Sequence, residues 1–356
     1  ECMLGQLSAM QLSITHERLI RDLFGDVARP AKHQLKVTNR LLLAVLLCKS
    51  DVCGVVRGVS ISELSKLTGM SKDMLRSQLR ALKVAGYIRS SVQGGIGICL
   101  FGMAKGAYFL NLRHCSFGGL AKSGVTAILP IVITHENGSL EGFRIFSLAG
   151  LIQGRRKNAV LRNNKSVVDK IDAYLRNADN GLINDVQSFI TIVELFRRDR
   201  KVSESFYLQM KVEEYASFLL SKRWADLANI DKEGDRQLID RIESDIYISN
   251  AEISNQQKIT LFEFIHHVSL RMALRVQNEI KLVQSVQWES MNFLILPCRK
   301  LSIPAVECFS NDGKCDSGYL VFYNEHDSAN KYKWVGDGDI PTDDKYFYGL
   351  LTDPKS

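Results

Sequence analysis

The stretch that decides the fold of the N-terminal part is Ser60-Ile-Ser-Glu-Leu-Ser-Lys-Leu-Thr-Gly69, followed by Met70-Ser-Lys-Asp-Met-Leu-Arg-Ser-Gln-Leu-Arg-Ala-Leu-Lys-Val-Ala-Gly86. In the first half, apolar side chains recur at helical spacing at Ile61, Leu64 and Leu67. This spacing gives a helix one buried face. The second half repeats the pattern, so the sequence predicts two amphipathic helices joined by a short turn.

The residues between and along these helices fit that prediction. Gly69 stands where a helix end needs a left-handed residue, and Ser71 is placed to cap the next helix. The second helix has an inward stripe of Leu75, Leu79 and Leu82. Its outward side carries Lys72, Arg76, Ser77, Arg80 and Lys83.

The flanking sequence extends the pattern on both sides. Residues 87–93 alternate like a strand, residues 94–107 are glycine-rich like the tip of a hairpin, and residues 108–112 are suited to the return strand. Upstream, Val37–Cys48 is typical of a buried helix capped by Thr38, and a short strand is expected at 55–56. The predicted order is helix, strand, helix, helix, strand, hairpin, strand.

This order resembles the winged helix-turn-helix family of bacterial transcription regulators, of the MarR-like kind. The phrase Leu-Ser-Lys-Leu-Thr-Gly-Met-Ser, the following Leu-x-x-x-Leu-x-x-Leu and Gly-Tyr-Ile-Arg carry the resemblance, which covers only the N-terminal part of the chain. The hairpin departs from the family because it is apolar at Ile96, Ile98, Leu100 and Phe101, with only Lys105 near its tip. Such a wing is suited to packing on a neighbouring domain rather than to entering a minor groove.

The resemblance implies that the second helix enters the major groove of double-stranded DNA. Ser71, at the N-terminus of this helix, is expected to contact DNA. Lys72, Arg76, Ser77 and Arg80 are expected to face the groove, where arginine can pair with guanine edges. A second set is expected mainly to hold phosphates. That set is Arg40, Lys66, Lys83, Arg89 and Lys105.

The charge distribution supports a polyanionic partner. Residues 28–125 contain fifteen Lys or Arg against three acids, a net charge of +12, whereas the whole chain is +7 and the remainder is therefore −5. Lysine and arginine that neutralise phosphates supply non-specific affinity for nucleic acid. A solvated surface that is basic without a ligand would carry the same charge, but an excess this large favours the nucleic-acid hypothesis.

Composition limits the other classes. No apolar run approaches the roughly 20 residues that cross a bilayer, and no secretory signal is visible at Glu1–Met3. We therefore expect a cytoplasmic, nucleoid-associated protein without a membrane partner. Eight scattered cysteines without a Cys-x-x-Cys pair favour free thiols and predict no metal site. These cysteines are Cys2, Cys48, Cys53, Cys99, Cys115, Cys298, Cys308 and Cys315.

Proline and glycine divide the chain. The predicted fold class is mainly α with small β. The N-terminal part is expected to contain a helical arm at 1–30 and a winged helix-turn-helix domain at 31–113. A connector with a β-hairpin at 114–153, a helical dimerisation or effector domain at 154–290 and a small β-rich or irregular cap at 291–356 are expected to follow. The segments Ala127–Ile133 and Gly142–Phe146 are compatible with this connector hairpin and with the start of the second domain. Helices are expected at Lys165–Asn177, Asn184–Phe196, Glu204–Ala228, Arg236–Ser249 and Gln256–Gln287.

Other polar clusters suggest little chemistry. Glu263 and His267 share a helix face beside His266, but no third metal ligand is evident, and a buried histidine pair is favoured. His114 and Cys115 are adjacent without an orienting carboxylate or amide. No phosphate-binding or nucleophile-elbow motif is present, so neither catalysis nor a cofactor is predicted. The basic cluster of residues 154–165 fits equally a phosphate grip or a solvated linker.

The sequence therefore predicts a sequence-specific DNA-binding protein that acts by occupancy rather than by catalysis. A homodimeric bacterial transcription regulator is the leading hypothesis, because regulators of this kind read two half-sites one helical turn apart. Two alternatives stay open at this point: a plasmid or phage replication or partition initiator, and a winged-helix module that binds protein. A small-molecule or protein effector is compatible with all three and has no signature in the sequence.

Overall fold

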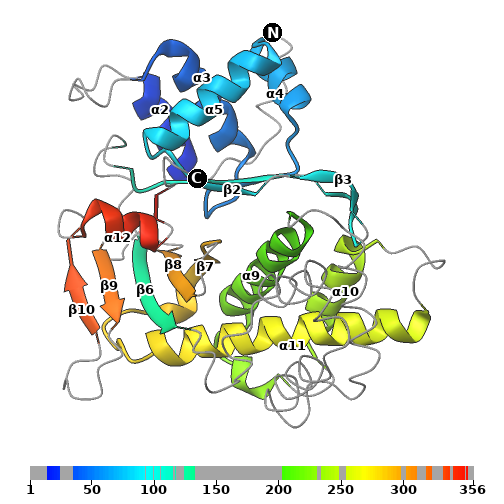
Figure 1. The fold of residues 1–356 in the computed structure, drawn as a ribbon. Coiled ribbons are helices and arrows are strands. Elements are labelled where there is room, and N and C mark those ends of the chain that lie inside the picture. The colour runs from blue at the N-terminus through cyan, green and yellow to red at the C-terminus, as the bar shows by residue number, and fades with distance from the viewer. Residues whose placement is uncertain are drawn as a thin grey trace, which may run out of the picture.

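The structure is a computed structural model of the 356-residue chain. It shows a helical N-terminal unit above a long β-ribbon, with a sheet and a group of helices on the ribbon's other side (Figure 1). The residues it describes are 14–24, 35–92, 94–98, 100–104, 106–114, 117, 124–132, 203–230, 234–247, 254–297, 302–310, 318–322, 332–336, 340–348 and 350–351.

The N-terminal unit is built on the helix pair that the sequence predicts. Its elements are α2 (Ile14–Phe24), α3 (Val37–Lys49), β1 (Val55–Arg57), α4 (Ile61–Thr68) and α5 (Lys72–Val84). Leucines from all four helices form one core, in which Leu19, Leu42, Leu64 and Leu82 are fully buried. The predicted arm at 1–30 therefore contributes α2 to this core, through Leu19 and Leu23.

The helix ends explain why the chain turns where it does. The Ser71 hydroxyl accepts a hydrogen bond from the Met74 N–H at 3.3 Å, so the predicted cap of α5 is confirmed. Gly69 ends α4 in the left-handed conformation with φ 71°, which a residue with a Cβ rarely adopts. The predicted cap at Thr38 is wrong, because α3 begins at Val37 and Lys36 occupies the capping position without a side-chain hydrogen bond.

A three-stranded sheet closes the unit. The strands after α5 are β2 (Ile88–Val92), β3 (Gly95–Ile98), β4 (Gly102–Ala104) and β5 (Ala107–Leu110). Antiparallel pairing of β5 with both β1 and β2 gives the order β1-β5-β2, and β3 pairs with β4 further along the ribbon. The glycine-rich segment is therefore a hairpin, as predicted, and the return strand ends at Leu110.

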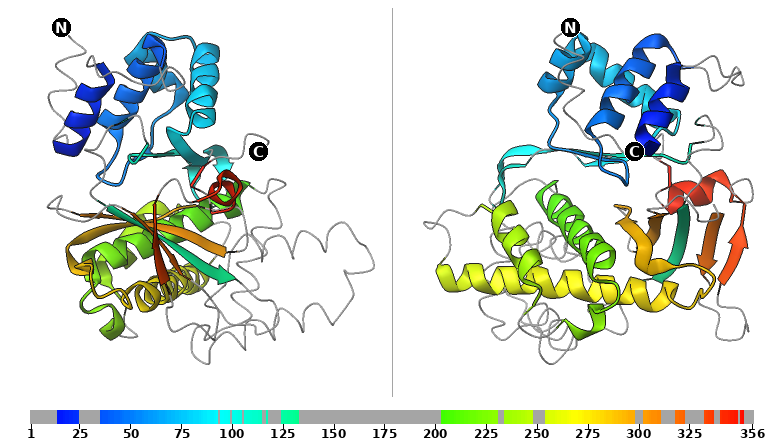
Figure 2. Two further views of the ribbon diagram at one scale, coloured as in Figure 1. Left: turned by 90° about the vertical axis from the view of Figure 1, so that its left-hand side faces the viewer. Right: turned by 180° about the vertical axis from the view of Figure 1, so that it is seen from behind.

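Successive side chains of a strand point to opposite faces of a sheet. In this small sheet, apolar side chains are buried on each face. Val56 and Leu110 belong to the core of the N-terminal helices, whereas Val55 and Phe109 belong to a second core shared with the rest of the chain. The sheet thus lies between two packed layers. Views turned by 90° and by 180° from Figure 1 show the ribbon crossing between the N-terminal helices and the elements below them (Figure 2).

The second unit contains a five-stranded sheet. Its strands are β6 (Gly124–Val132), β7 (Met291–Ile295), β8 (Ser302–Ser310), β9 (Gly318–Phe322) and β10 (Tyr332–Val335), in the order β10-β9-β6-β8-β7. β6 runs antiparallel to β8 and parallel to β9. The register of β6 with β8 shifts between Ile128 and Ile131, where Pro130 removes a backbone donor.

The position of β6 corrects the predicted organisation. Residues 124–132 form the central strand of a sheet whose other strands come from the C-terminal region. The described strands of the predicted connector and of the predicted cap therefore belong to one sheet, and the described chain is mixed α/β rather than mainly α with small β. The proposed hairpin partner at 142–146 lies outside the described residues, as do the helices predicted at 165–177 and 184–196.

The three helices predicted on described residues are present, but each ends earlier than predicted: α9 (Ser203–Arg223), α10 (Arg236–Asp245) and α11 (Asn255–Ile280). The described residues also include the short helices η5 (Leu227–Asn229), η6 (Trp288–Ser290) and α12 (Thr342–Phe347), of which η6 and α12 were not predicted. A capping box between Ser254 and Gln257 starts α11. The helix α11 is buried on several sides, as its apolar sequence predicts. In the described residues, no helix combines the length and apolar character needed to span a bilayer.

Candidate functional site

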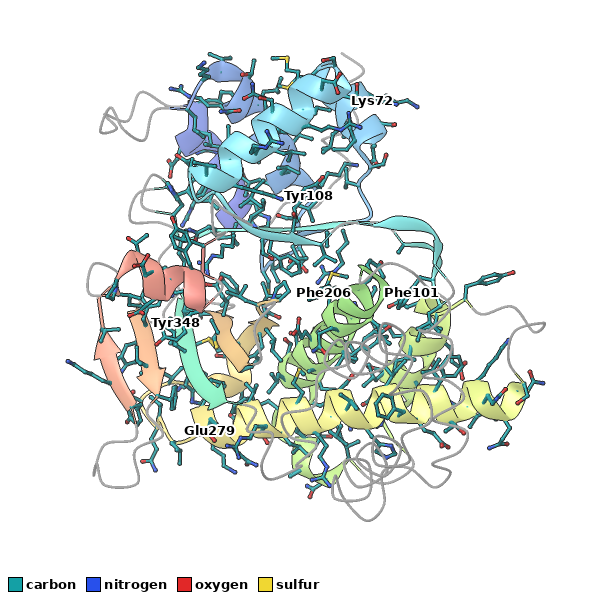
Figure 3. All side chains as sticks on the ribbon, viewed as in Figure 1. Lys72, Phe101, Tyr108, Phe206, Glu279 and Tyr348 are labelled. Carbon is teal, nitrogen blue, oxygen red and sulfur yellow. The ribbon has the colours of Figure 1, made fainter. Side chains whose placement is uncertain are left out.

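The helix α5 has two distinct sides. Its inward stripe is Leu75, Leu79 and Leu82, which are at most 6% exposed and pack in the N-terminal core. The outward residues Lys72 and Arg80 are exposed to solvent. Lys72 lies at the outer end of the N-terminal unit, away from α11 (Figure 3). The predicted orientation of this helix is therefore correct.

The middle of the outward side holds a charged pair. Ser77 is exposed, and the Arg76 side chain is 63% exposed. An Arg76 Nη1 atom donates to Asp73 Oδ1 at 2.7 Å, and the Asp73 side chain is 92% exposed. The pairing of Asp73 with Arg76 was not predicted, although the spacing of three residues on one helix indicates it.

The predicted phosphate-holding residues have different environments. Lys66 is exposed on α4, whereas Arg40 is partly buried and its Nε donates to the Leu35 carbonyl at 2.9 Å. Lys83 is also partly buried and donates from Nζ to Ser91 Oγ at 2.5 Å. Lys105 lies outside the described residues. Of these four, Lys66 is therefore the one that the structure shows exposed.

Arg89 contradicts the prediction that it holds a phosphate. Its side chain is 1% exposed and forms an ion pair with Glu307 on β8, with 2.5 Å between Nη1 and Oε1. Arg89 Nη2 also donates to Asn111 Oδ1 at 2.6 Å, and Glu307 accepts from Thr126. The alternating pattern of β2 does not reveal that this arginine faces an acid from the C-terminal sheet. Arg89 is consequently a buried link between the two units.

The apolar hairpin packs on a helix of the same chain. Leu100 is fully buried and Phe101 is 7% exposed. The Phe101 ring meets the Tyr207 ring of α9 edge to face, with 4.7 Å between centroids. The sequence-based expectation that this hairpin packs on a neighbouring domain is confirmed. Burial and the carboxylates of Glu214 and Asp245 raise the pKa of Tyr207 to about 12.

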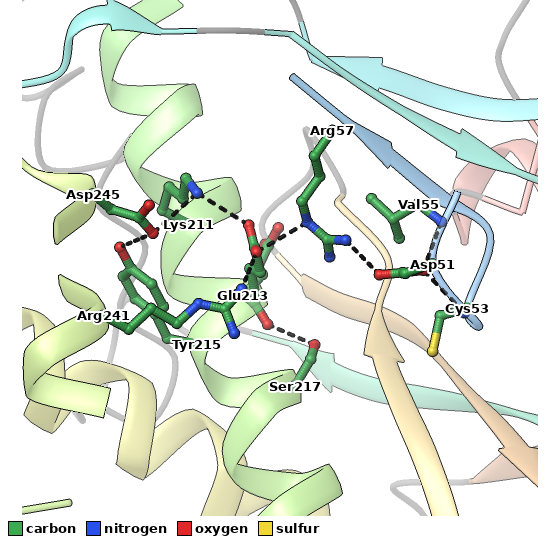
Figure 4. Close-up of polar contacts among 11 residues, drawn as sticks. Asp51, Cys53, Val55, Arg57, Lys211, Glu213, Tyr215, Ser217, Arg241 and Asp245 are labelled. Atoms are coloured by element: carbon green, nitrogen blue, oxygen red, sulfur yellow. Dashed lines mark hydrogen bonds and ion pairs between the residues drawn. The ribbon is translucent and has the colours of Figure 1, made fainter. Parts of the chain in front are cut away.

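Part of the positive charge of the N-terminal unit is neutralised at the junction with α9. Arg57 pairs with Asp51 of the same unit (Figure 4). Its Nε also lies 2.9 Å from Glu214 Oε1 on α9. Burial alone would lower the pKa of Arg57, but Glu214 and Asp51 raise it, so the guanidinium stays charged. Arg57 and Arg89 therefore cannot be counted in the solvent-facing charge of +12 that the sequence suggested.

Glu214 forms ion pairs with three cationic side chains at this junction. Besides Arg57, it pairs with Arg241 Nη2 at 2.5 Å and with Lys211 Nζ at 3.4 Å. Lys211 also pairs with Asp245, whose carboxylate accepts from the Tyr215 hydroxyl at 3.0 Å (Figure 4). Burial and Asp245 raise the pKa of Tyr215 well above its usual range. Acids and bases alternate here, which is typical of a structural network.

The histidines that suggested chemistry have structural environments. His266 is 3% exposed, and its Nε2 accepts the Asp235 N–H at 3.0 Å. Burial and His267 lower the pKa of His266 to about 4. His114 Nε2 donates to the Ala85 carbonyl at the end of α5, at 2.9 Å. Within the described ranges, no group of His, Cys, Asp or Glu has the arrangement that holds a metal ion.

Three cysteines lie on described residues, and their thiols are buried: Cys48, Cys53 and Cys308. Burial raises the pKa of the Cys53 thiol, and Asp51 and Glu307 add to that effect. Such thiols react poorly as nucleophiles. The basic cluster at 154–165 and Cys115 fall outside the residues that the structure describes.

The solvent-facing side of α5 is therefore the candidate site. It combines a capped N-terminus, three exposed cations and a serine on a helix whose opposite side is fixed in a core. No protein-family model, no curated protein and no solved structure matches this chain.

Proposed function

We propose that residues 35–112 form a winged helix and that the protein binds double-stranded DNA through α5. The order of α3, β1, α4, α5, β2, hairpin and β5, with the sheet order β1-β5-β2, supports the winged-helix part of the proposal. The exposure of Lys72, Arg76, Ser77 and Arg80 on one side of α5 carries the DNA-binding part.

In this proposal α5 lies in the major groove. Arg76 and Arg80 pair with base edges, for which guanine O6 and N7 are the favoured acceptors. Ser77 is short enough to let the helix approach the bases closely. At the N-terminus of α5, the positive end of the helix dipole and Lys72 favour a phosphate, whereas Asp73 in the same turn opposes one.

Phosphates flanking the groove are held mainly by Lys66, with Arg40, Lys83 and Lys105 as further proposed contacts. Arg89 is excluded from this set, because its charge is already compensated by Glu307. The hairpin is not proposed to enter a minor groove, because Phe101 is packed on α9. The contact with DNA is therefore centred on α5 and α4.

We propose a homodimeric transcription regulator, because two copies would read two half-sites one helical turn apart. A replication or partition initiator would use the same helix but would occupy repeated sites. Genome-wide footprinting of the intact chain distinguishes the two: a single symmetric site in front of a gene supports a regulator, whereas an array of direct repeats supports an initiator.

The third hypothesis, a winged module that binds protein, drew its support from the apolar hairpin. That hairpin is covered by α9 within the same chain, so its composition has an intramolecular explanation. Salt-titrated binding to random duplex separates the hypotheses. A DNA-binding protein gives a steep linear fall of log affinity with log salt concentration. A flat dependence, or no binding at low salt, would reject the DNA-binding proposal.

A further inference from the structure

Asp73 is an unusual residue for a helix side that is proposed to meet a polyanion. Residues 28–125 contain only two other acids, Asp51 and Glu63. Asp51 has a structural role, because its Oδ1 accepts from the Cys53 and Val55 N–H groups and its Oδ2 pairs with Arg57. Glu63 lies on α4 beside Lys49, at 3.5 Å. Asp73 lies on α5 itself.

The geometry of Asp73 relates it to Arg76 rather than to the core. Its side chain is 92% exposed, and Oδ1 accepts from Arg76 Nη1 at 2.7 Å, one helical turn away. An exposed pair of this kind contributes little to helix stability. On DNA, however, the Asp73 carboxylate would repel phosphates on every sequence. Asp73 also lies in the first turn of α5, where a carboxylate interacts favourably with the helix dipole. Any effect of Asp73 on base preference, by contrast, has to act through its contact with Arg76.

A guanidinium is a rigid planar fork with five N–H donors. When Asp73 holds one of them, the side chain of Arg76 is restricted in its rotamers, and donors on the rest of the fork remain for a ligand. A restricted side chain loses less conformational entropy when it binds. The bidentate acceptor that fits the remaining donors is a guanine edge in the major groove.

We propose that Asp73 is a positioning residue that sets the sequence specificity of α5 by orienting Arg76 toward guanine. This inference rests on the proposed DNA-binding function. Asp73 weakens binding to DNA in general through charge repulsion and strengthens the preference for one base pair through Arg76. The two effects have opposite signs, so a single substitution separates them.

The experiment begins with the wild-type full-length chain. Its preferred duplex is selected from a random-sequence library, and its affinities for that duplex and for random duplex are measured over a range of salt concentrations. Asp73→Ala is expected to bind random duplex about twofold to fivefold more tightly at low salt, since one exposed charge is removed. Its preference for the selected duplex over random duplex is expected to fall about tenfold.

Matched variants identify the cause. Glu63→Gln removes an acid from the neighbouring helix and should strengthen binding to both duplexes equally, leaving the preference unchanged. Asp73→Glu keeps an acid within reach of Arg76 and should restore most of the preference. In an Arg76→Ala background, Asp73→Ala should cause no further loss of preference, because the coupling runs through that arginine.

An unchanged preference in Asp73→Ala would overturn the inference and leave DNA binding intact, because Asp73 would then act as a charge alone. A lower unfolding midpoint, with both affinities reduced together and no rescue by Asp73→Glu, would also overturn it. Selection that returns no preferred duplex has the same consequence. A wild-type chain without salt-dependent duplex binding would reject the proposed function and this inference with it.

Discussion

Arg89 on β2 and Glu307 on β8 form an ion pair in which both side chains are 1% exposed and Nη1 lies 2.5 Å from Oε1. The pair joins the strand that follows α5 to a strand next to the centre of the C-terminal sheet. Asn111 and Thr126 add hydrogen bonds to its two members. The N-terminal unit is thus fixed to the rest of the chain by buried charge as well as by apolar contact.

Glu307→Gln should destabilise the protein by about 3–5 kcal/mol, because it leaves the Arg89 charge buried without its counter-charge. Chemical unfolding followed by circular dichroism measures the loss. Glu17→Gln is the matched control, since its partner Arg21 is 76% exposed. That control should cost less than about 1 kcal/mol. Equal costs for the two variants would mean that the Arg89–Glu307 pair is no more important than a surface pair.

Phe101→Ala should cost about 3–5 kcal/mol, because a buried aromatic ring packed on Tyr207 is replaced by a cavity. Tyr247→Ala removes an aromatic side chain that is 73% exposed and should change stability by no more than about 0.5 kcal/mol. Under conditions where both variants are folded, binding to random duplex should match wild type. A selective loss of DNA affinity in Phe101→Ala would show that the hairpin participates in binding.

Stability should fall as the pH is lowered from about 6.5 to about 4. His266 has a pKa of about 4 in the folded chain and 6.5 in the unfolded chain, so the unfolded state binds the proton more tightly in this window. Protonation also turns Nε2 into a donor facing the Asp235 N–H. The contribution is on the order of 3 kcal/mol.

His266→Gln tests this contribution, because a glutamine carries an amide oxygen that can accept from Asp235 and does not titrate. Unfolding free energies of the variant and the wild type are measured from pH 4 to 8. The variant should lose less stability on acidification than the wild type. His267→Gln is measured alongside, because burial also lowers the pKa of His267. It reports how much of the acid-induced loss of stability comes from the neighbouring histidine. Parallel curves for His266→Gln and wild type would contradict the assignment.

Arg76→Ala should change the base specificity of DNA binding, whereas Lys66→Ala should change only the affinity. Loss of Arg76 is expected to cost about 1–3 kcal/mol on the preferred duplex and to relax specificity at one base pair. Loss of Lys66 should weaken binding equally on all sequences and reduce the magnitude of the salt slope by about 1. Anisotropy titrations with single-base variants of the preferred duplex measure both. Uniform loss in Arg76→Ala would place that residue among the phosphate contacts.

The helix pair could be predicted because its determinants are local. Leu75, Leu79 and Leu82 lie one helical turn apart, Gly69 supplies a left-handed residue, and Ser71 supplies a cap, so every signal comes from within a few residues of the element it defines. The exposure of Lys72 and Arg80 follows from the same periodicity. This part of the candidate site therefore needs no knowledge of the remaining chain.

Apart from the cap at Thr38, the incorrect predictions involve partners that are distant in sequence. From the sequence, Arg89 is one of several cations of the N-terminal part and lies on a strand of alternating polarity. Its partner Glu307 lies on β8, in a sheet whose strand pairing with β6 and β7 the sequence does not indicate. Arg57 is compensated by Glu214 on α9 in the same way. Local periodicity identifies β6 as a strand but contains no signal for which strands will pair with it. Net charge per segment therefore overestimates the charge that faces solvent.

The proposed binding of DNA by α5 is tested with two variants of equal net charge. One replaces the three exposed cations of α5 by Lys72→Gln, Arg76→Gln and Arg80→Gln. The other replaces three exposed cations of the second unit. Those substitutions are Arg236→Gln, Lys281→Gln and Lys333→Gln, at positions exposed on α10, after α11 and on β10.

The decisive measurement is the affinity for random duplex as a function of salt concentration, for both variants and wild type. The α5 variant should lose most of its affinity. On random duplex, where the preferred base pairs are absent, all three cations are expected to contact phosphates, each contributing roughly 0.9, so the salt slope should become shallower by about two to three. The second-unit variant should keep a slope close to wild type. Equal changes in the two variants, or a wild-type affinity independent of salt, would contradict DNA binding through α5.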